Sequence, residues 1–326
     1  MIFDNIRRRL SGILLLAVVF LCLLWGNAFF NPPEKIVWHN SLFSGLPESI
    51  SPQVYVILSL LLTLLCGFLI YKISLDHLSV HKREHLLVWL WVIQIGGFSF
   101  LHTLNEVQFA VMFLLMSYNR LFYINRKESD YSGVFLSAMY LGIAAVFYNL
   151  TAYLLIPYIF GLYRFKTTGI KDWIVLIAGF LTPFYFAVFI SFFINGDWYY
   201  PIGNTIQNLI PSLPANPINL TTPQYIFIFF ILLLVCINLF SSLKLTSSVS
   251  QKTVACNSAF FRLMIFSIIL LFLFAPEANN ILMVIFITST TIIRNLFVQI
   301  NKNWVANLLF LLVIALSALA CYLPEI

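Results

Sequence analysis

Charged residues are scarce in this sequence: Asp, Glu, Lys and Arg make up only 9% of its 326 residues. A soluble domain carries roughly 25% charged residues, because they cover its surface in water. Hydrophobic residues make up 61% instead, and no polar stretch is long enough to fold separately. These proportions exclude a soluble globular protein. They predict one integral membrane domain over residues 1–326, with lipid as the surrounding solvent.

The sequence also lacks the motifs that identify common soluble enzymes. It has no Walker loop and no GxGxxG, HExxH or GxSxG motif. Its five cysteines include no CxxC pair, so neither a disulfide framework nor a zinc site is indicated. The net charge of +6 comes from basic residues scattered over short loops, so we expect no nucleic-acid partner. We predict no cofactor and no metal ligands. The alternative is a divalent cation held by carboxylates.

Long apolar runs are abundant, and they set the expected fold. A membrane-spanning helix needs about 20 mostly apolar residues. We predict an all-α, polytopic transmembrane helical bundle with about eleven membrane helices, in a range of about ten to twelve. The expected ranges are 11–30, 53–71, 86–101, 106–123, 133–148, 150–163, 173–194, 223–243, 259–274, 279–293 and 304–322.

The distribution of Lys and Arg orients these helices. Arg7, Arg8 and Arg9 precede the first helix. If all eleven helices cross in turn, every other Lys and Arg except Lys35 falls on the same side as these three. Acidic residues divide between the two sides, as expected from a positive-inside rule that depends on Lys and Arg. We therefore predict a cytoplasmic N-terminus and a periplasmic C-terminus, in the inner membrane of a bacterium.

Two pairs of predicted helices, 133–163 and 259–293, are short for a bilayer core of about 30 Å. Each pair begins and ends on the basic side, so two crossings and one re-entrant hairpin produce the same charge pattern. Interrupted helices at membrane depth often line a cavity, because their backbone needs protein or water around it. We expect the functional site beside these pairs.

Polar residues at the outer turns are the candidates for chemistry. His102 and Glu106 are four residues apart between the third and fourth helices, and they share one face if the turn is helical. Ionisable groups in a membrane are costly and often functional. Glu106 is therefore the first candidate for a catalytic carboxylate, with His102 beside it. The alternative is an exposed polar turn with no chemical role.

Two further outer carboxylates complete the predicted catalytic set. Glu277 follows Pro276 in the break between the ninth and tenth helices, and Asp197 opens the longest outer loop beside Trp198. A pair of carboxylates can serve as general base and metal ligand. The alternatives are a simple proline turn at Glu277 and an aromatic belt at the membrane interface around Asp197.

The segment 131–186 carries a family resemblance. Its distinctive stretches are Leu141 to Asn149, Leu154 to Pro157, Gly161 to Arg164 and Gly179 to Pro183. The segment resembles an uncharacterised family of multi-pass membrane proteins from the Bacteroidota. It is also similar, over roughly a sixth of the chain, to the C-type membrane glycosyltransferases, which take sugars from polyprenyl-phosphate carriers. This second resemblance implies a transferase in which Tyr148 and Asn149 replace the Thr-Lys of the family's hairpin.

Three functions are compatible with these features. The first is a glycosyltransferase-like enzyme acting on a lipid-linked substrate at the outer face, with Asn105, Tyr148, Asn149 and Arg120 as substrate-binding residues. The second is a transporter or lipid flippase, which the confinement of charge to the helix ends disfavours. The third is a non-catalytic subunit or scaffold of an envelope complex. The expected partners are membrane lipids, a polyprenyl-phosphate-linked substrate or another envelope protein.

Overall fold

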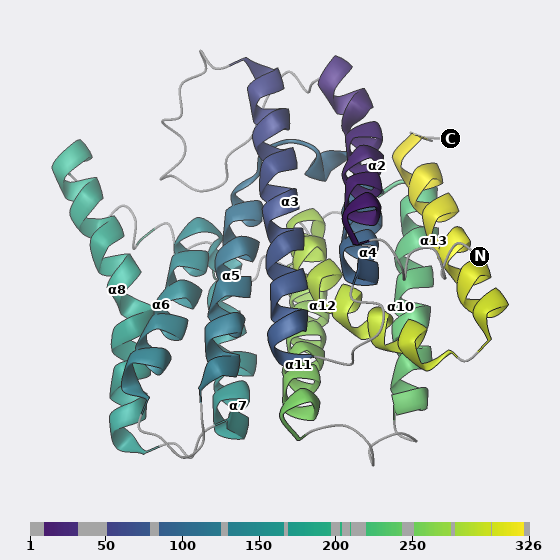
Figure 1. Ribbon diagram of the computed structural model, residues 1–326. Helices are drawn as coiled ribbons and strands as arrows, with labels where there is room; N and C mark the ends of the chain where they lie inside the picture. The colour runs from purple at the N-terminus through teal and green to yellow at the C-terminus, as the bar shows by residue number, and fades with distance from the viewer. Residues whose placement is uncertain are drawn as a thin grey trace.

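The computed structural model is all-α over the residues that it describes, which are 10–31, 51–78, 85–124, 130–165, 169–196, 203, 209, 220–242, 251–274, 278–300 and 302–322. This part of the chain forms eleven α-helices and two 3-10 helices (Figure 1). Their bounds are α2 Leu10–Phe30, α3 Pro52–His77, α4 His85–Gly96, η1 Ser99–Leu101, α5 Glu106–Tyr123, α6 Tyr131–Phe147, η2 Asn149–Leu154, α7 Leu155–Phe165, α8 Ile170–Asn195, α10 Thr222–Ser242, α11 Gln251–Leu273, α12 Ala278–Gln299 and α13 Asn303–Tyr322. Each of the eleven predicted ranges therefore overlaps one α-helix.

Six of these helices are long and apolar enough to cross a membrane: α3, α8, α10, α11, α12 and α13. The outward face of α8 shows the kind of surface that they present. Ile174, Tyr185 and Phe193 on this helix are 63%, 69% and 71% exposed. Such a surface suits lipid and would cause aggregation in water. The fold is therefore that of a membrane protein, while the number of helices that cross stays a prediction.

Helix α12 lies at the centre of the bundle, in contact with α4, α5, α10 and α11. In its most apolar stretch 89% of the residues are buried, compared with 28–39% in the other five long helices. It nevertheless carries the polar run Thr288 to Thr291. These hydroxyls donate to carbonyls one turn back, and Ser289 and Thr290 also donate to Gln94 Oε1 on α4, at 2.9 and 3.0 Å. A polar run is tolerated here because its hydrogen bonds are made inside the protein.

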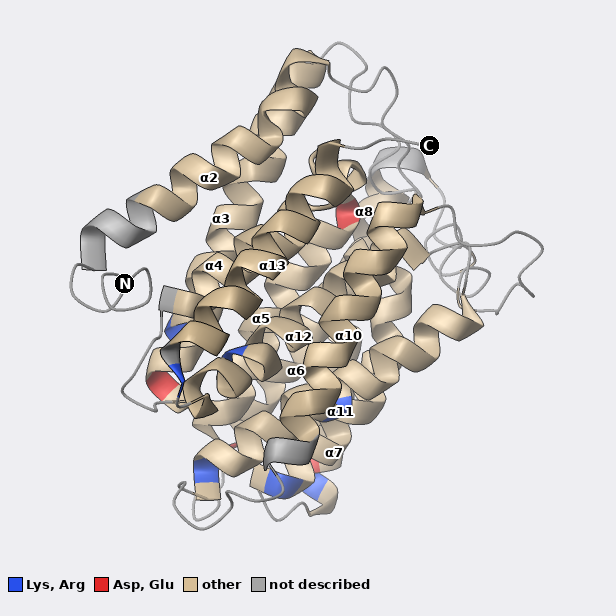
Figure 2. Cartoon of the chain, turned by 90° about the vertical axis from the view of Figure 1, so that its right-hand side faces the viewer, with Lys and Arg blue, Asp and Glu red and all other residues tan. Residues whose placement is uncertain are grey.

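Basic side chains gather at one end of the bundle, which we call the basic end (Figure 2). Helices α3, α5, α7 and α12 run toward it, and α8 and α11 begin there. The basic residues concerned are Lys72, Arg120, Arg164, Lys171, Lys252 and Arg294. We call the opposite end, where α5 and α12 begin, the far end. This distribution of basic residues follows the predicted alternation of helix directions. The side of the membrane that each end faces stays a prediction.

The two predicted short pairs differ in the structure. The first consists of α6, with 17 residues, and of η2 continued by the 11-residue α7. The turn between them is covered by protein, since Asn149 is 7% and Thr151 1% exposed. In the second pair, α11 begins at Gln251 rather than 259 and α12 ends at Gln299 rather than 293. This second pair is longer than predicted, because polar residues extend both helices beyond their apolar centres.

Candidate functional site

Glu106 occupies the first position of α5 at the far end, where the residue is only 2% exposed. Asn105 is the N-cap of the same helix, and its side-chain oxygen accepts a hydrogen bond from the Val107 backbone N–H at 3.3 Å. The N-terminal end of a helix carries partial positive charge, which favours a carboxylate at this position. The local sequence thus places Glu106 in a buried position that still suits its negative charge.

A second contact joins this helix start to the central helix. Asn105 Nδ2 donates to Asn280 Oδ1 on α12 at 2.8 Å, between residues 175 positions apart in sequence. Asn280 is itself 7% exposed. Asn280 was not among the residues predicted from the sequence, because no local pattern reveals a partner so far away. The hydrogen bond between Asn105 and Asn280 therefore makes α12 part of the site.

His102 lies in the connection between α4 and α5 and is 1% exposed. Its ring stacks on Trp25 of α2, with 3.9 Å between the ring centroids. Its Nε2 lies 3.1 Å from the Gly96 carbonyl oxygen, which can only accept, so Nε2 carries the proton. Burial lowers the pKa of His102 to about 4, against a smaller opposing effect of the Gly96 hydrogen bond. His102 is therefore neutral near pH 7, with Nδ1 as the basic nitrogen.

Glu106 and His102 do not share a helix face, because the turn between them is not continuous helix. The short helix η1 ends at Leu101 and α5 begins at Glu106. Gln108, buried completely, holds this turn in place: its Nε2 donates to Ser59 Oγ at 2.6 Å and to the Leu101 carbonyl at 2.9 Å. Sequence reasoning missed Gln108, although an amide within an apolar run was a visible signal.

The depressed pKa of His102 predicts a loss of stability in acid. The unfolded chain binds a proton at residue 102 near its ordinary pKa of 6.5, and the folded protein does so only near pH 4. The stabilising contribution is therefore complete above pH 6.5 and falls as the pH drops toward 4, by about 3 kcal/mol in all. Melting temperatures in detergent at pH 7 and pH 4.5 should fall less for His102→Gln than for the wild type. An equal fall in both proteins would contradict this account.

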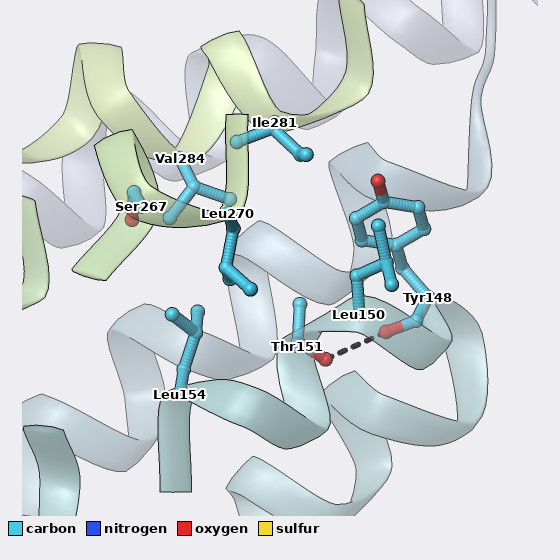
Figure 3. A pocket seen from close by; sticks show the side chains of 8 residues that line it. All are labelled: Tyr148, Leu150, Thr151, Leu154, Ser267, Leu270, Ile281 and Val284. Carbon is cyan, nitrogen blue, oxygen red and sulfur yellow. Dashed lines mark hydrogen bonds between the residues drawn. The ribbon is translucent and has the colours of Figure 1, made fainter. Parts of the chain in front are cut away.

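A small apolar pocket lies beside these polar groups, between the α6–η2 turn and the helices α11 and α12 (Figure 3). Its empty space of about 200 Å³ includes open solvent at the mouth, so the enclosed part is small. The lining residues are Tyr148, Leu150, Thr151, Leu154, Ser267, Leu270, Ile281 and Val284. Its two hydroxyl-bearing aliphatic residues bond to backbone carbonyls, Thr151 to Tyr148 at 2.7 Å and Ser267 to Leu263 at 2.8 Å. The pocket therefore offers an apolar surface at the meeting point of the two helix pairs.

The structure brings together only part of the predicted site. His102, Asn105 and Glu106 lie at the far end with Asn280, Gln108 and Ser59, and we call these six residues the far-end cluster. Tyr148 lines the pocket, and Asn149 is buried in the adjacent turn. Arg120 does not belong to this site: it lies in the last turn of α5, about 21 Å along the helix axis from Glu106. Asp197 and Glu277 lie outside the described residues.

Within the described ranges, no group of three or more His, Cys, Asp or Glu residues could hold a metal ion. Comparison with known proteins adds no family: no family model matches the chain, and no curated protein or solved structure matches it either. The functional argument therefore depends on the far-end cluster and on the pocket beside it.

Proposed function

We propose that this protein is a cell-envelope enzyme of a bacterial inner membrane that acts, in the manner of a glycosyltransferase, on a polyprenyl-phosphate-linked substrate at the far end. The observation that carries the proposal is the position of Glu106. The residue is 2% exposed and follows Asn105, which is hydrogen-bonded to Asn280 of α12. A buried carboxylate is costly in a protein embedded in lipid, and such residues commonly serve a function.

Helix α12 links the two parts of the proposed site. Asn280 contacts the N-cap of α5, and the residues that follow it, Ile281 and Val284, line the apolar pocket. A lipid-linked substrate has the same two parts, a polar head and a hydrocarbon chain. We assign the head to the far-end cluster and the nearest part of the chain to the pocket.

Transfer of a sugar requires a base at the acceptor. The acceptor hydroxyl attacks the anomeric carbon, the bond from that carbon to the phosphate oxygen breaks, and the phosphate leaves with the bonding electrons. The hydroxyl proton passes to Glu106, which acts as general base. His102 of the same cluster is neutral, with its Nε2–H directed to the Gly96 carbonyl, so it adds no positive charge to the cluster.

Replacing Glu106 by glutamine tests the proposal, because the amide keeps the size of the side chain and removes the base. In a strain that lacks the gene, we expect Glu106→Gln to fail to restore the envelope phenotype. Loss of a general base lowers a rate by about 10²- to 10⁴-fold. The purified variant should keep its melting temperature in detergent, because the hydrogen-bonded frame of Asn105 and Gln108 is unchanged.

A matched control is Asp130→Asn at the basic end. Asp130 is likewise a carboxylate at a helix start, here the N-cap of α6, and its Oδ1 accepts from the Gly133 backbone N–H at 2.7 Å, which asparagine can replace. This variant should restore the phenotype fully. If Glu106→Gln restores it equally well, the enzyme proposal is lost and a non-catalytic envelope subunit becomes the better description.

A further inference from the structure

An arginine lies inside a membrane helix near the basic end. Arg262 is half-buried and follows the first residue of α11 by eleven positions, a rise of about 17 Å. A guanidinium at such a depth needs partners in the protein or in the lipid.

The Arg262 side chain runs back toward the basic end. Its Nε donates to the Ser258 carbonyl, one turn earlier on α11, at 3.1 Å. Its Nη1 donates to the Phe160 carbonyl on the neighbouring helix α7 at 2.7 Å. Long side chains on a helix point toward its N-terminus, which for α11 is the basic end. The third nitrogen, Nη2, is buried and has no hydrogen-bond partner among the described residues.

A second guanidinium lies next to the first. Arg164 is four residues after Phe160 on α7, so it lies one turn further toward the basic end on the same helix face. Arg164 is exposed, and its charge acts on Arg262. Neither arginine forms an ion pair with a carboxylate in the part of the chain that the structure describes. Two cations without a counter-ion repel each other, and an anion between them would remove that cost.

Tyr118 of α5 adds a further polar group next to Arg262. It is completely buried, its hydroxyl has no hydrogen-bond partner in the part of the chain that the structure describes, and the charge of Arg262 acts on it. A buried hydroxyl without a partner is costly. The region around Arg262 therefore holds two buried, unpaired groups, the Arg262 Nη2 and the Tyr118 hydroxyl, both able to donate a hydrogen bond.

The surface beside the two arginines faces lipid. Ile156, Phe160 and Tyr163 on α7 are 44%, 50% and 51% exposed. An anion that reaches Arg164 from this side must accompany an apolar chain, as the phosphate of a lipid does. Basic sites between membrane helices are known to take lipid head groups, and arginine binds phosphate through two parallel hydrogen bonds.

We propose that Arg164 and Arg262, where α7 and α11 pack together, bind the phosphate of an anionic membrane lipid at the basic end. Arg164 reaches the phosphate from the head-group level, and Arg262 reaches it from one turn deeper, supported by the Phe160 carbonyl. The Tyr118 hydroxyl is a further donor for the phosphate or for an ordered water. The site is independent of the far-end cluster and of the function proposed for it.

Thermal stability of the purified protein in detergent tests the proposal with three additions: dioleoyl-phosphatidylglycerol, dioleoyl-phosphatidylcholine and inorganic phosphate. We expect phosphatidylglycerol alone to raise the melting temperature. For Arg164→Gln, the lipid concentration needed for half of this rise should increase by about tenfold, the loss of one charged hydrogen bond. Arg164 is the better test residue, because Arg262→Gln also removes the bond to α7.

The matched control is Lys171→Gln. It removes an exposed positive charge at the start of α8, a different helix from α7 and α11. This variant should respond to phosphatidylglycerol as the wild type does. If Arg164→Gln and Lys171→Gln lose the response to phosphatidylglycerol equally, the effect is one of general charge and the proposed site is overturned. Equal stabilisation by phosphatidylcholine would overturn the phosphate contact, and equal stabilisation by inorganic phosphate would overturn the lipid as its source.

Discussion

Replacing Gly142 by leucine is expected to separate α6 from α8 and to prevent the protein from folding stably. A Cβ atom at position 142 would overlap the Phe180 carbonyl oxygen and lie 3.1 Å from Pro183 Cγ, both on α8. On the opposite side, a Cβ at Gly179 would lie 2.5 Å from the Phe135 carbonyl oxygen of α6. The two helices touch through their backbones, and backbone atoms cannot move aside as a flexible side chain can.

Gly142→Leu should lower the free energy of unfolding by more than the roughly 1–3 kcal/mol of ordinary overpacking. The reason is that the two helices meet through backbone carbonyl groups, which cannot move aside. Helix α6 also leads directly into the turn that carries Tyr148, so its displacement would open the apolar pocket. Size-exclusion profiles and melting temperatures in detergent would measure the effect.

Gly26 on α2 provides the control, since a Cβ added there meets no atom within 4 Å. The variant Gly26→Leu should elute and melt like the wild type. If Gly142→Leu is monodisperse and melts within about 3 °C of the wild type, a shift of roughly 1 kcal/mol, the close packing of α6 on α8 does not hold in solution.

Trp91→Ala is expected to lower stability by about 3–5 kcal/mol, the usual cost of removing a large buried aromatic side chain. Trp91 on α4 is completely buried, and its Nε1 donates to the Thr63 carbonyl of α3 at 2.9 Å. Its Cδ1 lies 3.1 Å from the point where a Cβ of Gly67 would be. The indole thus fills the space that Gly67 leaves on α3, and alanine would leave a cavity between the two helices.

Trp304→Ala on α13 is the matched control, because its indole is 66% exposed. This change should alter stability by less than about 0.5 kcal/mol. Trp91→Phe should fall between the two, since the ring still fills most of the space but the hydrogen bond to Thr63 is lost. Melting curves of the three variants in one detergent would rank them, and equal values for Trp91→Ala and Trp304→Ala would contradict the assignment of α4 to the core.

The far-end cluster was partly visible in the sequence. The expectation that Glu106 and His102 lie together at one turn followed from their spacing, and the structure places both in one buried turn. The shared helix face depended on a helical turn, and that condition is not met, because η1 ends at Leu101 and α5 begins only at Glu106. The separation of Arg120 from the site was also visible in principle, since about 14 helical residues span about 21 Å.

The sequence alone determined the class of the protein and the positions of its helices. Apolar runs, interrupted by polar and proline-containing turns, identify the helices. They do so because every backbone N–H and C=O group in lipid must be hydrogen-bonded within its own helix. Only the tertiary structure decided which helix lies at the centre. Hydropathy cannot reveal this, because the interior of the bundle and the surrounding lipid are both apolar. The central position of α12, the bond from Asn105 to Asn280 and the contact of Gly142 with α8 depend on packing between distant segments, which no local pattern records.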